Sequence, residues 1–229
     1  MRLRNIKGSR EAIAASSYTI TPERAERTSF EERCDWSVKG HWNEVFENDH
    51  PLYLEIGMGK GAFLMEQARR HPEINYVGIE KYSSVLLRAV QKQEEQKLSN
   101  VRLIRMEAEN INDVFAEDEG NRIYLNFSDP WPKDGHAARR LTSHQFLERY
   151  DRILKDEGLL EFKTDNQELF AFSLEEIDPE KWEICVLTRD LHKDPELMKE
   201  NVMTEYEARW AEQGKPICGV HLRHRKAPD

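Results

Sequence analysis

From residue 50 onward, short apolar runs alternate with longer amphipathic segments. Short apolar runs between polar residues are typical of buried strands, and amphipathic segments are typical of helices that cover a sheet. The alternation predicts an α/β fold, with a mostly parallel sheet and helices on both faces. The seven predicted strands are residues 52–56, 75–79, 101–105, 122–127, 158–163, 183–189 and 217–223. The predicted helices are residues 61–71, 82–97, 110–116, 139–155, 166–177 and 201–213.

The first part of the chain lacks this alternation. Residues 1–39 combine mixed charge with Ser16-Ser17 and Thr21-Pro22, which favours an N-terminal extension that is partly helical or mobile. Residues 40–229 are enough for one sizeable α/β domain with its own apolar core. We therefore expect an extension with a basic start, followed by a single domain.

The sequence gives no sign of a membrane segment or a metal site. No stretch approaches the roughly 20 apolar residues of a membrane-spanning helix, and polar residues follow Met1–Arg4 where a signal peptide would be apolar. Cys34, Cys185 and Cys218 are far apart and form no C-x-x-C pair, and the histidines show no metal-ligand spacing. These features predict a cytoplasmic protein without a disulfide framework or a bound metal.

The charge is acidic overall but unevenly distributed. A net charge of -9 argues against indiscriminate binding to nucleic acid. Basic residues nevertheless gather in residues 1–10, 133–140 and 221–226. Separated basic patches on an acidic protein favour a polyanion of a particular shape, although solvated chain ends explain the same pattern.

A glycine turn joins the first predicted strand of the domain to the helix that follows it. Gly57, Gly59 and Gly61 let the backbone turn sharply and approach a ligand closely. Their G-x-G-x-G spacing differs from the G-x-G-x-x-G of dinucleotide-binding folds, and an acid, Glu55, comes just before it. This acid would repel a pyrophosphate and attract an ammonium group. The turn therefore favours S-adenosylmethionine, which carries an ammonium and a sulfonium, over NAD.

Acids also end the next two predicted strands. Glu80 ends the second strand, where a carboxylate accepts both hydroxyls of a ribose in doubly wound folds. At the end of the third strand, the backbone near Ala108 and a polar side chain could hold an adenine edge, and Glu107 and Glu109 are equally placed for this role. Together with the glycine turn, these acids predict a nucleoside-containing cofactor.

The fourth strand ends in Asn126-Phe127-Ser128-Asp129-Pro130-Trp131-Pro132-Lys133. Each proline fixes φ and lacks an N–H, so the strand stops and Asp129 and Trp131 are held in a stiff turn. Two explanations are open. The turn positions a nucleobase with Trp131 stacked on it, or Trp131 fills the core while Asp129 bonds to local amides.

The glycine turn with its preceding acid, the acid that ends the second strand and the Asp-Pro-Trp-Pro stretch together resemble the tRNA (guanine-N7)-methyltransferases of bacteria. The likeness spans about residues 40–215 and includes Phe162–Asn166 and Asn201–Glu207. It implies the three-layer, Rossmann-like fold of class I methyltransferases and S-adenosylmethionine as methyl donor. It further implies methylation of guanosine 46 in the variable loop of tRNA. The sequence leaves open whether the protein is a monomer or a homodimer.

The residue pattern and the resemblance together give candidate site residues. The implied catalytic residue is Asp129. The candidate cofactor-binding residues are Glu55, Gly57, Gly59, Gly61, Glu80, Glu107, Ala108 and Asp129. The candidate substrate-binding residues are Lys133, Arg139, Arg140, Asp165, Thr204, Glu205, Tyr206 and Glu207.

Two of the substrate-binding segments have a second explanation. Thr204-x-x-Glu207 and Asp165-x-x-Glu168 both match the helix capping box, in which the two side chains satisfy backbone amides at the start of a helix. On spacing alone, the cap and the substrate contact remain alternatives.

The chemistry of guanine limits what the site must do. N7 has a lone pair and no proton, so its methylation does not require a general base. Asp129 would accept hydrogen bonds from the N1–H and amino groups, orient N7 towards the sulfonium methyl group and favour the positive charge of the product ring.

Three other functions fit the sequence less well. An NAD-dependent oxidoreductase needs a pyrophosphate-compatible turn, which Glu55 opposes. An RNA-binding protein without catalysis leaves Glu55, Glu80 and the Pro-Trp-Pro turn without a purpose. A methyltransferase that acts on an exocyclic amine would carry Asn-Pro-Pro-Tyr or Asp-Pro-Pro-Tyr at the end of the fourth strand, whereas the aromatic residue here lies between two prolines.

Overall fold

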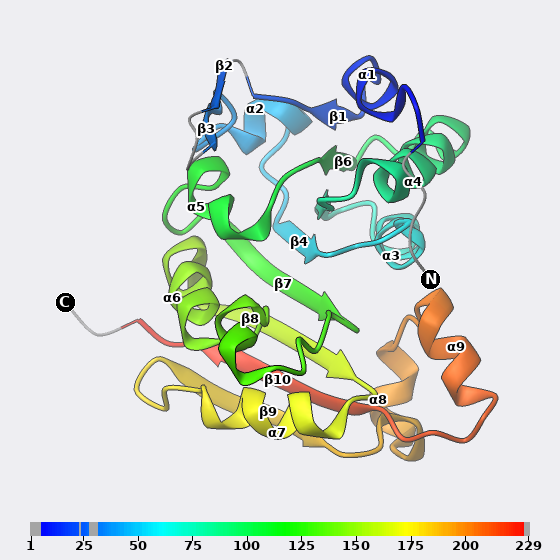
Figure 1. Cartoon of the computed structure of the whole chain (residues 1–229), viewed down its shortest axis with the longest axis vertical. Helices are drawn as coiled ribbons and strands as arrows, with labels where there is room; N and C mark the ends of the chain where they lie inside the picture. Colours follow the sequence, from blue (N-terminus) through cyan, green and yellow to red (C-terminus); the bar gives the residue numbers. More distant parts are fainter. Residues whose placement is uncertain (1–5, 23, 28–31, 227–229) are drawn as a thin grey trace.

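An eight-stranded sheet forms the centre of the structure, a computed structural model that describes residues 6–22, 24–27 and 32–226 (Figure 1). The strand order is β1-β6-β5-β4-β7-β8-β10-β9. β10 runs antiparallel to both of its neighbours, and the other pairs are parallel. The strands are β1 (Thr19–Ile20), β4 (Leu52–Ile56), β5 (Asn75–Ile79), β6 (Val101–Ile104), β7 (Gly120–Asn126), β8 (Leu154–Thr164), β9 (Trp182–Thr188) and β10 (Cys218–His224).

The chain order of the strands reverses at β4. From β4 the chain continues outward through β5 and β6 on one side, and then returns to place β7 and β8 on the other. In open α/β sheets, a crevice forms at the carboxyl ends of the two strands where the order reverses, and ligands bind there. The crevice here lies beyond β4 and β7.

Helices cover both faces of the sheet and produce two apolar clusters. One cluster includes side chains of α1, α3 and α4, and the other includes side chains of α2, α5, α6 and α7. Because a parallel sheet must be buried on both faces, these clusters explain the near-continuous apolar runs of its central strands. The bounds are α1 (Ser9–Ala14), α2 (Trp42–Phe46), α3 (Ala62–Arg70), α4 (Ser83–Gln96), α5 (Ile111–Val114), α6 (His144–Ile153) and α7 (Gln167–Glu175).

The remaining elements are short. α8 and α9 follow β9, and α9 lies near the carboxyl ends of β7 and β8 (Figure 1). A two-stranded antiparallel sheet is formed by β2 and β3. The bounds are α8 (Pro195–Glu200), α9 (Glu205–Ala211), β2 (Arg24–Arg27), β3 (Glu32–Asp35) and the 3₁₀ helices η1 (Ala108–Asn110), η2 (Asp134–Arg139) and η3 (Leu191–Lys193).

The seven predicted strands and six predicted helices are present, and three of them begin four or more residues from the predicted position. The strand predicted over residues 158–163 begins earlier, at Leu154. The helix predicted over residues 139–155 is divided into η2 and α6, and the helix predicted over residues 201–213 begins only at Glu205. The strand count of seven is wrong, because β1 adds an eighth strand beside β6. A strand of two residues is too short to show a hydrophobic period.

Part of the predicted N-terminal extension, the helix α1, packs against α4 of the main domain. The Ser9 hydroxyl of α1 donates to the Ser83 hydroxyl of α4 at 2.9 Å, and Ile13 belongs to the same apolar cluster as α4. Residues 1–5, with two of the basic side chains of the start, lie outside the described residues. The division at residues 39 and 40 stays a prediction. In the described part of the chain, no helix is both long and apolar enough to cross a membrane.

We predict that Gly78→Ala destabilises the protein. A Cβ atom at Gly78 would overlap the sulfur of Met58, which belongs to the turn after β4. It would also lie 2.8 Å from Leu64 Cδ2. Overpacking of this kind costs about 1–3 kcal/mol in the free energy of unfolding, measurable by urea denaturation. Gly135→Ala is the control, because a Cβ atom there has nothing within 4 Å. An equal effect of the two substitutions would contradict the packing argument.

Candidate active site

The glycine turn lies at the carboxyl end of β4. Gly57, Gly59 and Gly61 have φ angles of 74°, 60° and 72°, in the left-handed region that side chains with a Cβ atom disfavour. The amides of Gly57 and Met58 donate to the carbonyl oxygen of Ile79 at 2.9 and 3.1 Å. These bonds fold the turn against the end of β5 and leave its outer side open to a ligand.

Glu55 lies directly before this turn and is almost completely buried, with 2% of its surface exposed. Its Oε1 accepts a hydrogen bond from Asn126 Nδ2 at 2.9 Å, whereas Oε2 has no partner within hydrogen-bond distance among the residues that the structure describes. The Leu64 backbone amide acts on the same carboxyl group and favours its ionised form. Burial raises the pKa of Glu55 to about 8, against the opposing effects of the Asn126 hydrogen bond and the Lys163 charge. A buried carboxyl group with a free oxygen fits a cationic ligand, which would satisfy Oε2 and stabilise the ionised form.

Glu80 lies at the end of β5, on the other side of the turn. Its side chain is 7% exposed and accepts hydrogen bonds from the amides of Gly59 at 3.2 Å and Tyr82 at 2.9 Å. Burial raises its pKa, although these two amides act in the opposite direction. Each carboxylate oxygen keeps a further lone pair, so Glu80 can still accept the two hydroxyls of a ribose.

Two cavities meet at the glycine turn, and Gly57 lines both. The larger, of about 610 Å³, has Glu80 at one side and Asp129 at another. The smaller, of about 250 Å³, has Glu55 at its base and α9 as a wall. A nucleoside fits the first and an amino-acid moiety the second, so the two cavities together match the two ends of S-adenosylmethionine.

The third predicted cofactor contact remains divided between two residues. Glu107, Ala108 and Glu109 all line the larger cavity. Glu107 is largely exposed and lies 3.9 Å from the Lys81 ammonium, measured from its Oε2. The structure therefore brings the whole segment to the cavity, and the choice between the two acids stays open.

The Asp-Pro-Trp-Pro turn forms one side of the larger cavity. Phe127 and Trp131 both adopt positive φ, at 52° and 40°, which costs conformational energy in residues other than glycine. The Arg140 guanidinium donates to the carbonyl oxygens of Pro130 and Trp131, both at 3.1 Å, and lies 4.2 Å from the Phe172 ring. Arg140 therefore holds the turn in place rather than facing a substrate.

Trp131 does not fill the core, so that explanation of the turn is wrong. The side chain is half-buried and lines the larger cavity. Its ring lies 5.1 Å from the Arg139 guanidinium and 5.7 Å from the Lys81 ammonium. Asp129, on the same turn, is exposed and also lines this cavity.

The predicted substrate-binding residues fall into two groups. Lys133 and Arg139 are exposed, and Arg139 also lines the larger cavity beside Trp131. Asp165 lies near α9 instead, where its Oδ2 accepts a hydrogen bond from the Tyr206 hydroxyl at 3.3 Å. The Tyr206 ring packs 5.1 Å from that of Phe127, and both line the smaller cavity.

The capping-box alternative is confirmed for one segment and wrong for the other. The Thr204 hydroxyl accepts from the Glu207 amide at 2.9 Å, and both halves of the box are present. Glu207 is fully buried, so its predicted direct contact with substrate has no support in this geometry. At α7 the cap is Asn166, whose Oδ1 accepts from the Leu169 amide at 2.7 Å.

Sequence reasoning missed Asn126 and Lys163 as members of the site. The sequence places Asn126 in the stretch that ends the fourth strand and indicates no role for it, yet its side-chain amide donates a hydrogen bond to Glu55. The parallel register of β4 and β7 brings the two together, and that register was not read from the sequence. No group of three or more possible metal ligands occurs among residues 6–22, 24–27 and 32–226.

Comparisons with known proteins agree with this geometry. The family described as "Putative methyltransferase" matches residues 49–220. A tRNA (guanine-N(7)-)-methyltransferase of Lachnoclostridium phytofermentans is 52% identical over 218 residues, which cover 95% of each chain. A protein of the same name from Geobacillus sp. is 45% identical over 231 residues, which cover 99% of each chain.

Solved structures support the fold. An rRNA methylase from Streptococcus thermophilus aligns with a TM-score of 0.53 and 16% identity, covering 81% of this chain and 96% of that one. A methyltransferase from Streptococcus mutans, solved in complex with SAH, aligns with a TM-score of 0.51 and 13% identity, covering 98% and 99%. The three-layer, Rossmann-like methyltransferase fold is therefore confirmed.

Burial of Glu55 predicts a distinctive pH dependence of stability. The folded protein holds the Glu55 proton more tightly than the unfolded chain does, so the free energy of unfolding should fall as pH rises from about 4.5 to about 8. The contribution is about 1.4 kcal/mol per pH unit. Glu55→Gln removes it, so we expect the variant to be the more stable protein near pH 8, with the difference narrowing towards pH 5.

Urea unfolding without added cofactor, at several pH values, measures this difference. Glu95→Gln, on the exposed side of α4, is the matched control and should follow the wild type. A Glu55→Gln protein whose stability changed with pH as the wild type does would show that Glu55 titrates normally.

Proposed function

The chain belongs to the tRNA (guanine-N7-)-methyltransferase family and is an S-adenosylmethionine-dependent methyltransferase, and we propose that it forms 7-methylguanosine at position 46 in the variable loop of tRNA. One structural observation carries the assignment to this chemistry. The free oxygen of buried Glu55 and the carboxylate of Glu80 flank the glycine turn at the meeting point of two cavities, and Asp129 lies at their edge.

Residues of this chain would hold the cofactor at both ends. S-adenosylmethionine, when bound, supplies an electrophilic methyl group on a sulfonium. Glu55 Oε2 would accept from its ammonium group, and Glu80 would accept from its ribose hydroxyls. The segment around Glu107 and Ala108 would contact the adenine. The glycine turn would lie against the cofactor, because no Cβ atoms keep its backbone away.

Asp129 would act on the guanine. As an exposed carboxylate at the cavity edge, it can accept hydrogen bonds from the guanine N1–H and amino groups. This contact would orient N7 and stabilise the positive charge that develops on the ring. No proton has to be removed from N7, so the reaction needs no general base.

Aromatic side chains would support the displaced base. Trp131 lines the larger cavity, and the Tyr206 and Phe127 rings line the smaller one, so aromatic surface lies on both sides of the region next to Asp129. Stacking on such a surface contributes about 1–3 kcal/mol per base. This stabilisation offsets the cost of taking guanosine out of the tRNA fold.

Exposed cations near the turn would contact the tRNA backbone. Lys133 and Arg139 are exposed beside the cavity, whereas Arg140 would act indirectly by holding the turn. The basic C-terminal segment is less available, because Arg225 pairs with Glu183 at 2.6 Å and Lys226 with Asp118. We also propose a cytoplasmic location, where tRNA is found, and activity as a monomer or homodimer without a bound metal.

We predict that Asp129→Asn lowers methyl transfer by about 100-fold or more while the protein still binds cofactor, because the amide keeps the shape but loses the negative charge. Transfer of labelled methyl from S-adenosylmethionine to unmodified tRNA measures the rate. Cleavage with borohydride and aniline, which cuts at 7-methylguanosine, should locate a single cut in the variable loop.

Asp134→Asn is the matched control, since Asp134 is an exposed acid in the following 3₁₀ helix and lines neither cavity. It should stay within about twofold of the wild type, as surface substitutions usually do. Full activity of Asp129→Asn would remove Asp129 from the mechanism. A cut elsewhere in the tRNA would overturn position 46 alone.

A further inference from the structure

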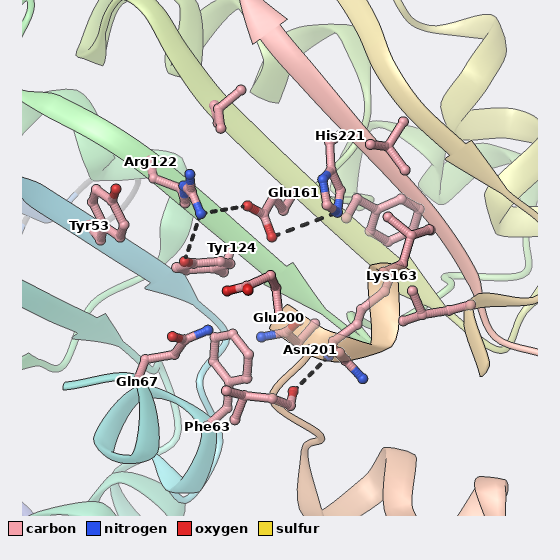
Figure 2. Close-up of a pocket in the computed structure, with 18 of the residues that line it drawn as sticks. Tyr53, Phe63, Gln67, Arg122, Tyr124, Glu161, Lys163, Glu200, Asn201 and His221 are labelled. Carbon is pink, nitrogen blue, oxygen red and sulfur yellow. Dashed lines mark hydrogen bonds and ion pairs between the residues drawn. The ribbon is translucent and has the colours of Figure 1, made fainter. Parts of the chain in front are cut away.

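Lys163 lies near the end of β8, at one side of a cavity of about 440 Å³ on the sheet face next to α3 and α8 (Figure 2). The side chain is only 9% exposed. Its ammonium group donates to Asn201 Oδ1 and to the Val202 carbonyl oxygen, both at 2.9 Å, and to Glu207 Oε2 at 2.6 Å. An ammonium has three N–H donors, so this lysine is fully satisfied by the segment after α8 and by α9.

Glu207 receives an equally complete set of partners. Its fully buried carboxylate accepts from Lys163, from Asn201 Nδ2 at 2.8 Å and from the Thr204 amide, and His192 Nε2 lies 3.0 Å from it. Burial alone would raise the pKa of Glu207, but the Lys163 charge and the hydrogen bonds bring it below its ordinary value. Such a pair is stable only when every partner is in place, so it selects one position of α9.

That position places α9 at the smaller cavity. Thr204, Glu205 and Tyr206 line this cavity together with Glu55. Exposed ion pairs from Glu205 to Lys92, at 2.9 Å, and to Lys60, at 3.6 Å, add little stability of their own. The buried Lys163–Glu207 pair is therefore the main polar attachment of α9 to the sheet.

Lys163 is also next to the hydrogen-bond chain that leads to Glu55. In the β7–β8 register Asn126 pairs with Lys163, and the Asn126 side chain donates to Glu55. Lys163 and Asn126 both line the cavity of about 440 Å³, and Asn126 lines the smaller cavity at the glycine turn as well. One buried ammonium thus lies between α9 and the acid at the base of the site.

We propose that Lys163 is a positioning residue for methyl transfer: through Glu207 it holds α9 against the smaller cavity, and its charge stabilises the carboxylate form of Glu55. The inference rests on the proposed function, because both effects act on the site assigned to the cofactor. Lys163 itself lines neither of the two cavities at the glycine turn.

The charge effect has a direction that can be measured. Around Glu55, burial is the largest influence and raises its pKa to about 8. The Asn126 hydrogen bond, the Lys163 charge and the Leu64 amide lower that pKa, and the Glu80 charge raises it. Loss of the Lys163 charge should therefore raise the pKa of Glu55 further. Cofactor binding that needs the ionised form of Glu55 weakens as the solution is acidified. Without the Lys163 charge, this weakening should begin at a higher pH than in the wild type.

Lys163→Met and Glu207→Gln separate the two effects, with Lys199→Met, an exposed lysine paired only with Glu196, as the control. Binding of S-adenosylmethionine is measured by calorimetry from about pH 6 to pH 9.5. We expect Lys163→Met to weaken binding about tenfold and move the acidic limb of the profile upward by about one pH unit. Burial lowers the pKa of Lys163 and Glu207 is the largest influence that raises it, so Glu207→Gln weakens the lysine charge without removing the lysine. Its acidic limb should therefore move upward less than that of Lys163→Met.

Hydrogen exchange reports on α9 directly. Amides of residues 203–213 should exchange at least about tenfold faster in both variants and at the wild-type rate in Lys199→Met. Methyl transfer to tRNA is measured beside these assays. Lys163→Gln replaces the methionine variant if the latter does not fold.

The outcomes distinguish the two proposals. Wild-type protein that binds S-adenosylmethionine but methylates no tRNA would overturn the proposed function. Active wild-type protein with unchanged exchange in both variants would overturn the positioning of α9 by Lys163. An equal upward shift of the acidic limb in both variants, or no shift in Lys163→Met, would overturn the charge effect on Glu55.

Discussion

Burial of the Glu55 carboxyl group beneath the glycine turn is the constraint on which the rest of the site depends. A carboxylate removed from water is costly unless a charge or hydrogen bonds compensate it. In the described part of the chain, only Oε1 of Glu55 has a partner within hydrogen-bond distance. The buried Glu55 carboxyl group therefore lowers the free energy of unfolding of the ligand-free protein. A cationic ligand at the free oxygen would restore it, which makes the acid a selective contact for an ammonium and a poor one for a phosphate.

The sheet topology explains why such a costly group can be held in place. The order reversal at β4 brings β5 and β7 to either side of Glu55, so the Glu80 carboxyl and the Asn126 amide approach the turn from different strands. Strand ends in a packed sheet are rigid, and side chains on them keep their geometry better than loop residues do. The two segments proposed to contact the substrate, the Asp-Pro-Trp-Pro turn and α9, lie outside the sheet, and each needs side-chain contacts that fix its position. Arg140 provides them for the turn, and Lys163 provides them for α9.

How far the sequence predicts this site depends on the range of the interaction. Strands and their terminal acids are visible because burial imposes a short apolar run, and Glu55 and Glu80 come where those runs end. The cap formed by Thr204 and Glu207 was visible because it spans a single helical turn. The pairing of Glu207 with Lys163 is not visible in the sequence, because the two residues are far apart in the chain and meet only after folding. The capping-box spacing accounts for Glu207 within its own helix, and it gives no indication that the same carboxylate also binds a lysine on another strand.

The pairing of charges explains how an acidic protein can recognise a polyanion at one place. With a net charge of -9, long-range attraction for any phosphate backbone is weak. The cations of the C-terminal segment are engaged by acids, as Arg225 is by Glu183, and this reduces their field. Lys163 is enclosed and engaged by Glu207. Lys133 and Arg139 are exposed, and Arg139 lines the larger cavity. In the proposed function, a tRNA would gain most from these cations when a guanine also enters the site. Recognition then depends on shape and on the displaced base, more than on charge alone.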